Sequence, residues 1–131
     1  MRFLVAVTFI LIGVPAWADD LPKLEDFKWI ARPLVIFADS EADPRVAQQL
    51  QMLEEDMARL EERDVVILVD TDPTVASPLR LALRPRDFMV VQIGKEAGVI
   101  YRKPKPVTAR EIIHLIDRTP LRKQELEARK Q

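Results

Sequence analysis

Aspartate and arginine side chains that border the apolar stretches of this chain are the groups best suited to chemistry. They share one kind of position, the point where an apolar run ends or where a turn leads into the next element: Asp39, Ser40, Asp43, Asp70, Asp72, Arg86 and Arg102. Carboxylates serve as general acids, general bases or metal ligands, and arginines bind carboxylate and phosphate groups. The sequence therefore offers two chemistries, a carboxylate cluster and an anion-binding surface.

Other reactive groups are scarce. The 131 residues contain no cysteine and one histidine, which excludes thiol redox chemistry and a cysteine-histidine zinc site. His114 falls on the polar face of a predicted helix and is expected to be solvated, and no motif supplies Ser40 with a base. Residues 39–43 resemble the start of a calcium loop, but Pro44 and Leu50 stand where that loop needs glycine and glutamate. We therefore predict no metal and no cofactor.

Residues 1–18 have the form of a signal peptide. Arg2 precedes an apolar run of about a dozen residues, which is shorter than the roughly 20 that a membrane-spanning helix needs. Small residues at Ala16 and Ala18 predict cleavage after Ala18, with an uncleaved anchor as the alternative. Asp19 follows the cut, where a lipoprotein anchor would need cysteine. We expect a periplasmic or secreted protein with no membrane span after cleavage.

Two apolar runs flank an amphipathic stretch in the first half of the chain. Residues 34–38 and 65–69 are unbroken apolar runs, which are typical of strands buried on both faces of a parallel sheet. The stretch between them begins with Asp43-Pro44, a helix-capping residue before proline, and closes at Arg63-Asp64. Its apolar stripe consists of Val46, Leu50, Leu53, Met57 and Leu60. The pattern predicts a strand-helix-strand unit with parallel strands.

The second half predicts a short helix, a hairpin and a closing helix. Asp72-Pro73 and Ser77-Pro78 are start signals for a helix within residues 73–84. Its expected apolar contacts are Leu79, Leu81 and Leu83. Residues 88–93 and 99–102 flank a glycine-bounded connection, as strands of a hairpin do. Thr108 begins the closing helix and Pro120 stops it. The tail after it shows two helical i,i+4 ion pairs, Lys123 with Glu127 and Glu125 with Arg129.

This order of elements is that of the thioredoxin fold, and residues 27–118 resemble a thioredoxin-like domain. We predict an α/β fold with a central four-stranded mixed sheet and helices on both faces. The lead-in is expected at 19–31, the domain at 32–118 and a charged helical tail at 119–131. Residues 39–44 replace the Cys-x-x-Cys motif, and Arg86-Asp87 stands where such proteins keep a cis-proline, unless Pro85 is displaced to serve. Redox function is therefore not carried over.

At finer grain the chain resembles the bacterial family called domain of unknown function 4174, which is related to domains of animal matrix proteins with sushi repeats or coiled coils. Four stretches carry this resemblance: residues 32–40, 62–66, 94–102 and 117–126. The last is the most distinctive because no rule of the fold demands it. The resemblance implies a thioredoxin-like fold and export. It brings no catalytic residue and suggests a binding or matrix role.

In that fold the first, second and fourth strands end at one edge of the sheet and the third begins there, so the seven candidate residues would share one rim. Open α/β sheets place ligands at this edge. The alternative is purely structural: Asp43 and Asp72 as helix caps, and Arg86 or Arg102 paired with Asp39 or Asp70. With a net charge of −1 and alternating signs, nothing favours nucleic acid. We expect a binding module for a protein or small anionic ligand, or alternatively a non-redox enzyme or metal-binding protein that uses the carboxylates.

Overall fold

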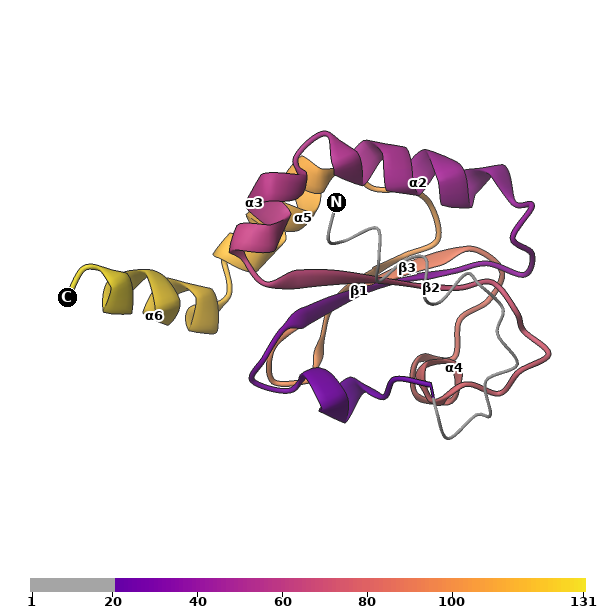
Figure 1. The fold of residues 1–131 in the computed structure, drawn as a ribbon, viewed down its shortest axis with the longest axis horizontal. Coiled ribbons are helices and arrows are strands. Elements are labelled where there is room, and N and C mark those ends of the chain that lie inside the picture. The colour runs from indigo at the N-terminus through magenta and orange to yellow at the C-terminus, as the bar shows by residue number, and fades with distance from the viewer. Residues whose placement is uncertain (1–20) are drawn as a thin grey trace.

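The computed structural model describes residues 21–131, so the predicted signal peptide lies outside the described residues (Figure 1). In chain order the helices and strands are η2 (Leu24–Phe27, a short 3-10 helix), β1 (Arg32–Phe37), α2 (Pro44–Glu54), α3 (Met57–Glu62), β2 (Val65–Asp70), α4 (Pro78–Leu83), β3 (Met89–Ile93), β4 (Val99–Lys103), α5 (Ala109–Asp117) and α6 (Pro120–Arg129). Within this range no helix is both long enough and apolar enough to cross a membrane.

The strands form one mixed sheet in the order β2-β1-β3-β4. β1 and β2 run parallel, with Phe37 beside Asp70 at their carboxyl ends. β3 runs antiparallel to both β1 and β4. The β3-β4 connection is the predicted hairpin, closed by a hydrogen bond from the Gly94 N–H to the Gly98 carbonyl, 2.8 Å apart. The four-stranded mixed sheet inferred from the sequence is confirmed.

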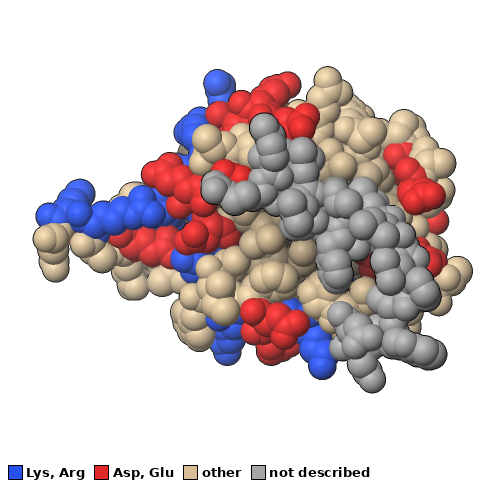
Figure 2. Space-filling model, viewed as in Figure 1, with Lys and Arg blue, Asp and Glu red and all other residues tan. Residues whose placement is uncertain are grey.

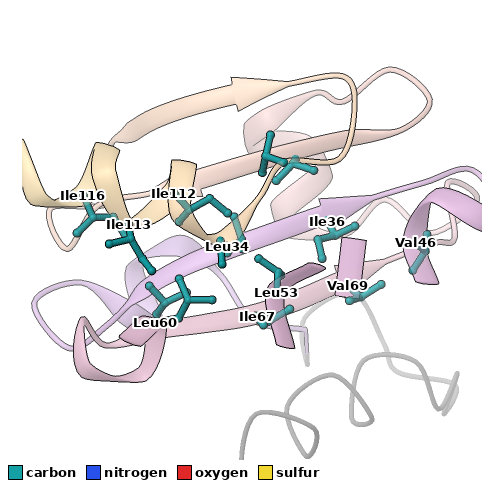
Figure 3. Close-up of a cluster of buried hydrophobic side chains, with 14 of the residues drawn as sticks. Leu34, Ile36, Val46, Leu53, Leu60, Ile67, Val69, Ile112, Ile113 and Ile116 are labelled. Atoms are coloured by element: carbon teal, nitrogen blue, oxygen red, sulfur yellow. The ribbon is translucent and has the colours of Figure 1, made fainter. Parts of the chain in front are cut away.

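Helices cover both faces of the sheet, as predicted. Alternate residues of a strand point to opposite faces, and β1 is buried along its whole length. On one face Leu34 and Ile36 pack in a cluster with side chains of α2, α3 and α5 (Figure 3). On the other face Val35 and Phe37 pack with side chains of α4, and residues of η2 adjoin that cluster (Figure 1). Because both faces are covered, β1 needs an unbroken apolar sequence.

The single helix predicted between the first two strands is divided in two. α2 ends at Glu54, and Asp56 has the non-helical dihedrals φ −136° and ψ 34° before α3 begins. Three consecutive acidic residues, 54–56, stand at the carboxyl end of α2, where the helix dipole disfavours negative charge. The apolar stripe nevertheless keeps its direction, since Leu53 and Leu60 are both fully buried.

The predicted helix over residues 73–84 is shorter than expected. α4 begins only at Pro78, where the Ser77 hydroxyl accepts a hydrogen bond from the Arg80 N–H. A residue before proline is pushed out of the helical region, so the helix cannot extend through Ser77. Of the three leucines expected in its core contact, Leu79 and Leu83 are buried but Leu81 is 64% exposed. Spacing of four places the first two on one face of the helix and leaves Leu81 on the opposite face.

The closing helix and the tail form as two helices. Thr108 caps α5 by accepting a hydrogen bond from the Glu111 N–H, 3.1 Å away, as its spacing predicted. His114 is exposed on the outer side of α5, which confirms the predicted helix phase. Pro120 both ends α5 and occupies the first position of α6, where its missing N–H costs no hydrogen bond.

Candidate functional site

The seven candidate residues lie at or just beyond one edge of the sheet, which we call the carboxyl edge. The register pairs Phe37 with Asp70 and also with Met89, so β1 and β2 end where β3 begins. β4 ends there too, because Lys103 is paired with Val90. The topological inference from the sequence is therefore confirmed.

Asp70 is already engaged in a half-hidden ion pair. The Arg80 Nε lies 3.0 Å from Asp70 Oδ1, and the Ser77 hydroxyl donates to Asp70 Oδ2 over 2.7 Å. Arg80 also donates to the Ala38 carbonyl at 2.7 Å and lies over the Phe37 ring. The side chains of Asp70 and Arg80 are only 13% and 11% exposed. This arrangement ties the start of α4 to the ends of β1 and β2.

The expected pairing of Asp70 with Arg86 or Arg102 is therefore wrong, because Arg80 takes that place. Arg80 was not among the candidate residues, although the sequence contains a signal for it. Arg80 stands three residues after the cap Ser77. A side chain in the first helical turn leans back toward the helix start, which here faces the end of β2.

Asp43 is likewise occupied, by Arg45. The Asp43 carboxylate caps α2, accepting from the Arg45 N–H at 2.9 Å, and the Arg45 guanidinium lies 2.7 Å from the same carboxylate. Hydrogen bonds from the Arg45 side chain and then from its backbone hold the pKa of Asp43 below its ordinary value. The same guanidinium reaches Asp87 at 3.1 Å and stacks on the Phe88 ring. The predicted capping role of Asp43 is confirmed.

Asp72 caps a turn rather than a helix. Its carboxylate accepts hydrogen bonds from the Thr74 hydroxyl and, over 3.0 Å, from the Thr74 N–H. These bonds, the hydroxyl one first, lower the pKa of Asp72. The turn is completed by the Val75 N–H, which donates to the Asp72 carbonyl. The helix cap predicted at Asp72 is thus wrong, since α4 starts six residues later.

Four of the candidates are left on the surface of the carboxyl edge: Asp39, Ser40, Arg86 and Arg102. The Ser40 hydroxyl accepts from the Ala42 N–H at 3.1 Å, and within residues 21–131 it donates to no histidine or carboxylate. Within residues 21–131, no ion pair or hydrogen bond engages the side chain of Asp39, Arg86 or Arg102. The carboxyl edge therefore presents two arginines able to bind a carboxylate or phosphate group.

A second group of charges occupies the opposite edge, where β1 and β2 begin and the β3-β4 hairpin turns. We call it the amino-edge network, and its members are Arg32, Glu62, Arg63, Asp64, Lys95, Asp117, Arg122 and Glu125. Arg32 and Arg122 are both 1% exposed, which is rare for arginine. Figure 2 shows acidic and basic side chains interleaved where α6 joins the body of the protein.

Glu125 is the hub that attaches α6. Its carboxylate lies 3.3 Å from the Arg32 guanidinium and 2.9 Å from the Lys95 ammonium. Partial burial raises the pKa of Glu125, but the hydrogen bonds from Lys95 and Arg32 outweigh this effect and lower it overall. The helical pair predicted between Glu125 and Arg129 is absent from the ion pairs of the described residues, because Glu125 turns to the sheet instead.

Arg63 makes the best-aligned pair of this network. Its Nε and Nη2 lie 2.7 and 3.0 Å from the two oxygens of Asp117, a bidentate geometry. The hydrogen bond from Arg63 holds the pKa of Asp117 below its ordinary value. Arg63 Nη1 also donates to the Arg59 carbonyl at 2.9 Å. The pair thus joins the end of α3 to the end of α5.

Comparison with known proteins identifies both the family and the fold. The family model described as "Domain of unknown function (DUF4174)" matches residues 23–125. No curated protein sequence matches the chain. All four stretches on which the resemblance rested contribute to the amino-edge network, through Arg32, Arg63, Lys95 and Glu125 among others. The distinctive fourth stretch is thereby explained as the segment that fastens α6 to the sheet.

Solved structures with the same fold include peroxiredoxins and thioredoxins. The reduced 2-Cys peroxiredoxin of Plasmodium vivax is 14% identical, with a TM-score of 0.60 over 83% of this chain and 90% of that one. The exposed lipoprotein thioredoxin of Streptococcus pneumoniae is 14% identical, with a TM-score of 0.57 over 79% and 96% of the two chains. Chloroplastic thioredoxin z is 21% identical, with a TM-score of 0.50 over 66% and 75%. At such identities these neighbours show the thioredoxin-like fold alone.

Proposed function

The chain belongs to the family described as domain of unknown function (DUF4174), and we propose that it is an exported binding module without redox chemistry. Its ligand is a protein or a small anionic molecule that binds at the carboxyl edge. Export follows from the signal peptide expected at residues 1–18, and the working protein begins at Asp19 in the periplasm or outside the cell.

The observation that supports this function is the pair of unengaged arginines. Within residues 21–131, Arg86 and Arg102 are exposed without an ion-pair partner, whereas Arg45 and Arg80 at the same edge are held by aspartates. An arginine that stabilises the fold is expected to have a carboxylate or carbonyl to bind. Unengaged guanidinium groups are available to an anionic group of a ligand, and they raise its rate of encounter.

Redox chemistry is outside this function because its nucleophile is missing. Residues 39–44 contain no cysteine between β1 and α2, and the whole sequence has none. The protein is therefore expected to show no disulfide reductase or peroxidase activity, both of which need a thiolate. Turnover in an insulin-reduction assay or a peroxide assay would contradict the proposal.

No observation favours the alternative of a carboxylate enzyme or metal-binding protein. Asp70, one of the carboxylates that this alternative would use, is occupied by Arg80 and Ser77. In the part of the chain that the structure describes, no three histidine or carboxylate side chains are arranged to hold a metal ion. Calcium and magnesium are expected to leave the melting temperature of the protein unchanged in a titration. Stabilisation by either ion would revive the alternative.

The direct test is a thermal-shift titration with anions, namely phosphate, citrate and an acidic peptide. The wild-type chain is expected to gain stability with at least one of them, and Arg86→Ala and Arg102→Ala to reduce that gain. Without ligand both variants are expected to melt at or slightly above the wild-type temperature, because neither arginine has a partner to lose. Arg118→Ala is the matched control, since Arg118 is exposed near the opposite edge. An unchanged anion response in both variants would exclude this site.

A further inference from the structure

The edge strand β4 combines features that point to a particular kind of partner. β4 is the last strand of the sheet, and its backbone makes no hydrogen bond to any described element other than β3. A strand in this position presents a row of unpaired N–H and C=O groups, to which another extended chain can add. Unlike the fully buried β1, it is exposed or half-buried along its whole length.

One end of β4 is apolar and exposed. Val99, its first residue, is 48% exposed. Ile100, the next residue, is half-buried. Apolar side chains that keep this much surface in water gain free energy when they are covered, so this end of β4 favours an apolar contact.

The other end of β4 is cationic. Tyr101 and Lys103 both bind the Glu111 carboxylate of α5, so their polar groups are engaged on one face of the sheet. Arg102 points to the other face and is exposed without a partner among residues 21–131. Lys105, just beyond the strand, is also exposed. The free charge at this end therefore favours an acidic partner.

These charges also argue against a second copy of the same chain. β4 carries Arg102 and Lys103 and no acidic residue. Two copies joined edge to edge around Arg102 would bring their two unpaired guanidinium groups together, and like charges on paired strands are destabilising. Natural proteins use such charges to prevent edge pairing between copies. A strand with carboxylates would turn the same charges into favourable cross-strand pairs.

We propose that the outer edge of β4 binds an extended peptide segment of a partner protein, acidic where it lies beside Arg102 and apolar where it lies beside Val99. The segment adds antiparallel to β4 as a fifth strand, so its acidic half comes first. The inference rests on the proposed function in one respect, that the carboxyl edge binds an anionic group. It adds the class of ligand and the means of binding, through backbone hydrogen bonds.

The test follows a fluorescent peptide as it binds the protein that begins at Asp19. The probe is the amidated peptide Glu-Val-Glu-Val-Thr-Val-Thr, labelled with fluorescein at its N-terminus. We expect a saturable rise in its fluorescence anisotropy as the protein is added. A labelled peptide with lysine in place of both glutamates, and one with alternate backbone nitrogens methylated, are expected to give no rise.

Variants locate the peptide on β4. Arg102→Glu turns an attractive charge pair into a repulsive one, so we expect it to weaken binding at least about fivefold. Arg118→Glu is the matched control and is expected to leave the affinity unchanged. Binding that survives backbone methylation or Arg102→Glu would overturn the strand-addition inference, as would the absence of any binding.

Failure of this inference can be told apart from failure of the proposed function. If small anions bind in an Arg86-dependent manner and the methylated peptide binds as well as the unmethylated one, the proposed function stands and strand addition is wrong. If the peptide binds in an Arg102-dependent manner while Arg86→Glu and small anions have no effect, strand addition stands and the wider rim is not the site.

Discussion

The two edges of the same sheet use charge in opposite ways. At the amino edge, buried and half-buried groups from distant parts of the chain meet in one network, in which Arg32 and Arg122 are almost fully enclosed. At the carboxyl edge, Asp43 pairs with Arg45 and Asp70 with Arg80, close to each other in sequence, although Arg45 also reaches Asp87, and other charges stay in solvent. Charges of the first kind hold elements together, whereas those of the second kind remain available to a ligand.

Among the substitutions that test this difference between the edges, Arg63→Ala is expected to lower the free energy of unfolding most. Arg63→Ala removes the bidentate partner of Asp117 and leaves that carboxylate half-buried. Removal of one member of a buried pair costs about 3 to 5 kcal/mol of unfolding free energy, and the cost here is expected near the lower end because Asp117 is 36% exposed. Urea denaturation measures it. The matched change Arg86→Ala at the carboxyl edge should alter stability by no more than about 0.5 kcal/mol.

Arg80→Ala is the intermediate case. It strips Asp70 of its ion pair and the Ala38 carbonyl of a donor, although Ser77 still donates to Asp70. We expect a loss of about 1 to 3 kcal/mol, the cost of leaving charged or polar groups without a partner. The same denaturation experiment applies. A loss as small as that of Arg86→Ala would mean that the pair of Asp70 with Arg80 does not stabilise the fold.

Low pH is expected to destabilise the protein through the carboxylates of the amino-edge network. The pKa of Glu125 is lowered, despite the burial that raises it, by hydrogen bonds from Lys95 and Arg32, and that of Asp117 chiefly by Arg63. Carboxylates with a lowered folded-state pKa contribute stability that is complete above their unfolded values of about 4.3 and 3.9 and is lost as the pH falls through the folded values. The melting temperature is therefore expected to fall below about pH 4 to 5.

Glu125→Gln tests the source of that fall. The amide does not titrate, so the variant should melt lower at neutral pH and show a shallower dependence on acid than the wild type. Asp39→Asn is the matched control, because Asp39 has no ion-pair partner within residues 21–131. An equal change of slope in the control would show that the acid sensitivity does not arise in the amino-edge network.

The smallest expected effect is the coupling free energy between Asp39 and Arg86, which should be zero. Asp39 and Arg86 share an edge but make no ion pair in the described part of the chain, so a double-mutant cycle of Asp39→Asn and Arg86→Ala should be additive within about 0.5 kcal/mol. The corresponding cycle of Arg63 and Asp117 should not be additive. A coupling of about 1 kcal/mol between Asp39 and Arg86 would show that these charges pair in solution and serve stability.

The elements of the fold could be predicted because their signals are local. The apolar runs, the Asp43-Pro44 start and the glycine-bounded hairpin each depend on neighbouring residues, and each formed as expected. The division of the first helix at Asp56 was missed, since an apolar stripe continues across a break that preserves its direction. Leu81 was misplaced because three leucines at alternate positions cannot all face one side of a helix.

The position of the candidate residues at one edge of the sheet could be predicted, but their ion-pair partners could not. Strand order is sufficient to bring Asp70 and Arg102 to one edge. Which arginine then reaches Asp70 depends on where α4 begins, and the helix start was predicted too early. The amino-edge network was missed for a further reason. A pair such as Arg32 with Glu125, 93 residues apart, leaves no periodic trace in a sequence.

That separation also governs the order in which the molecule is expected to assemble. Closing a long loop is entropically costly, so contacts between residues near each other in sequence form first. The hairpin and the β1-β2 unit can form while α6 is still detached, and Glu125 reaches Arg32 only after the sheet exists. Contacts made after the rate-limiting barrier slow unfolding without speeding folding. The amino-edge network should therefore set how long a folded molecule persists rather than how quickly it forms.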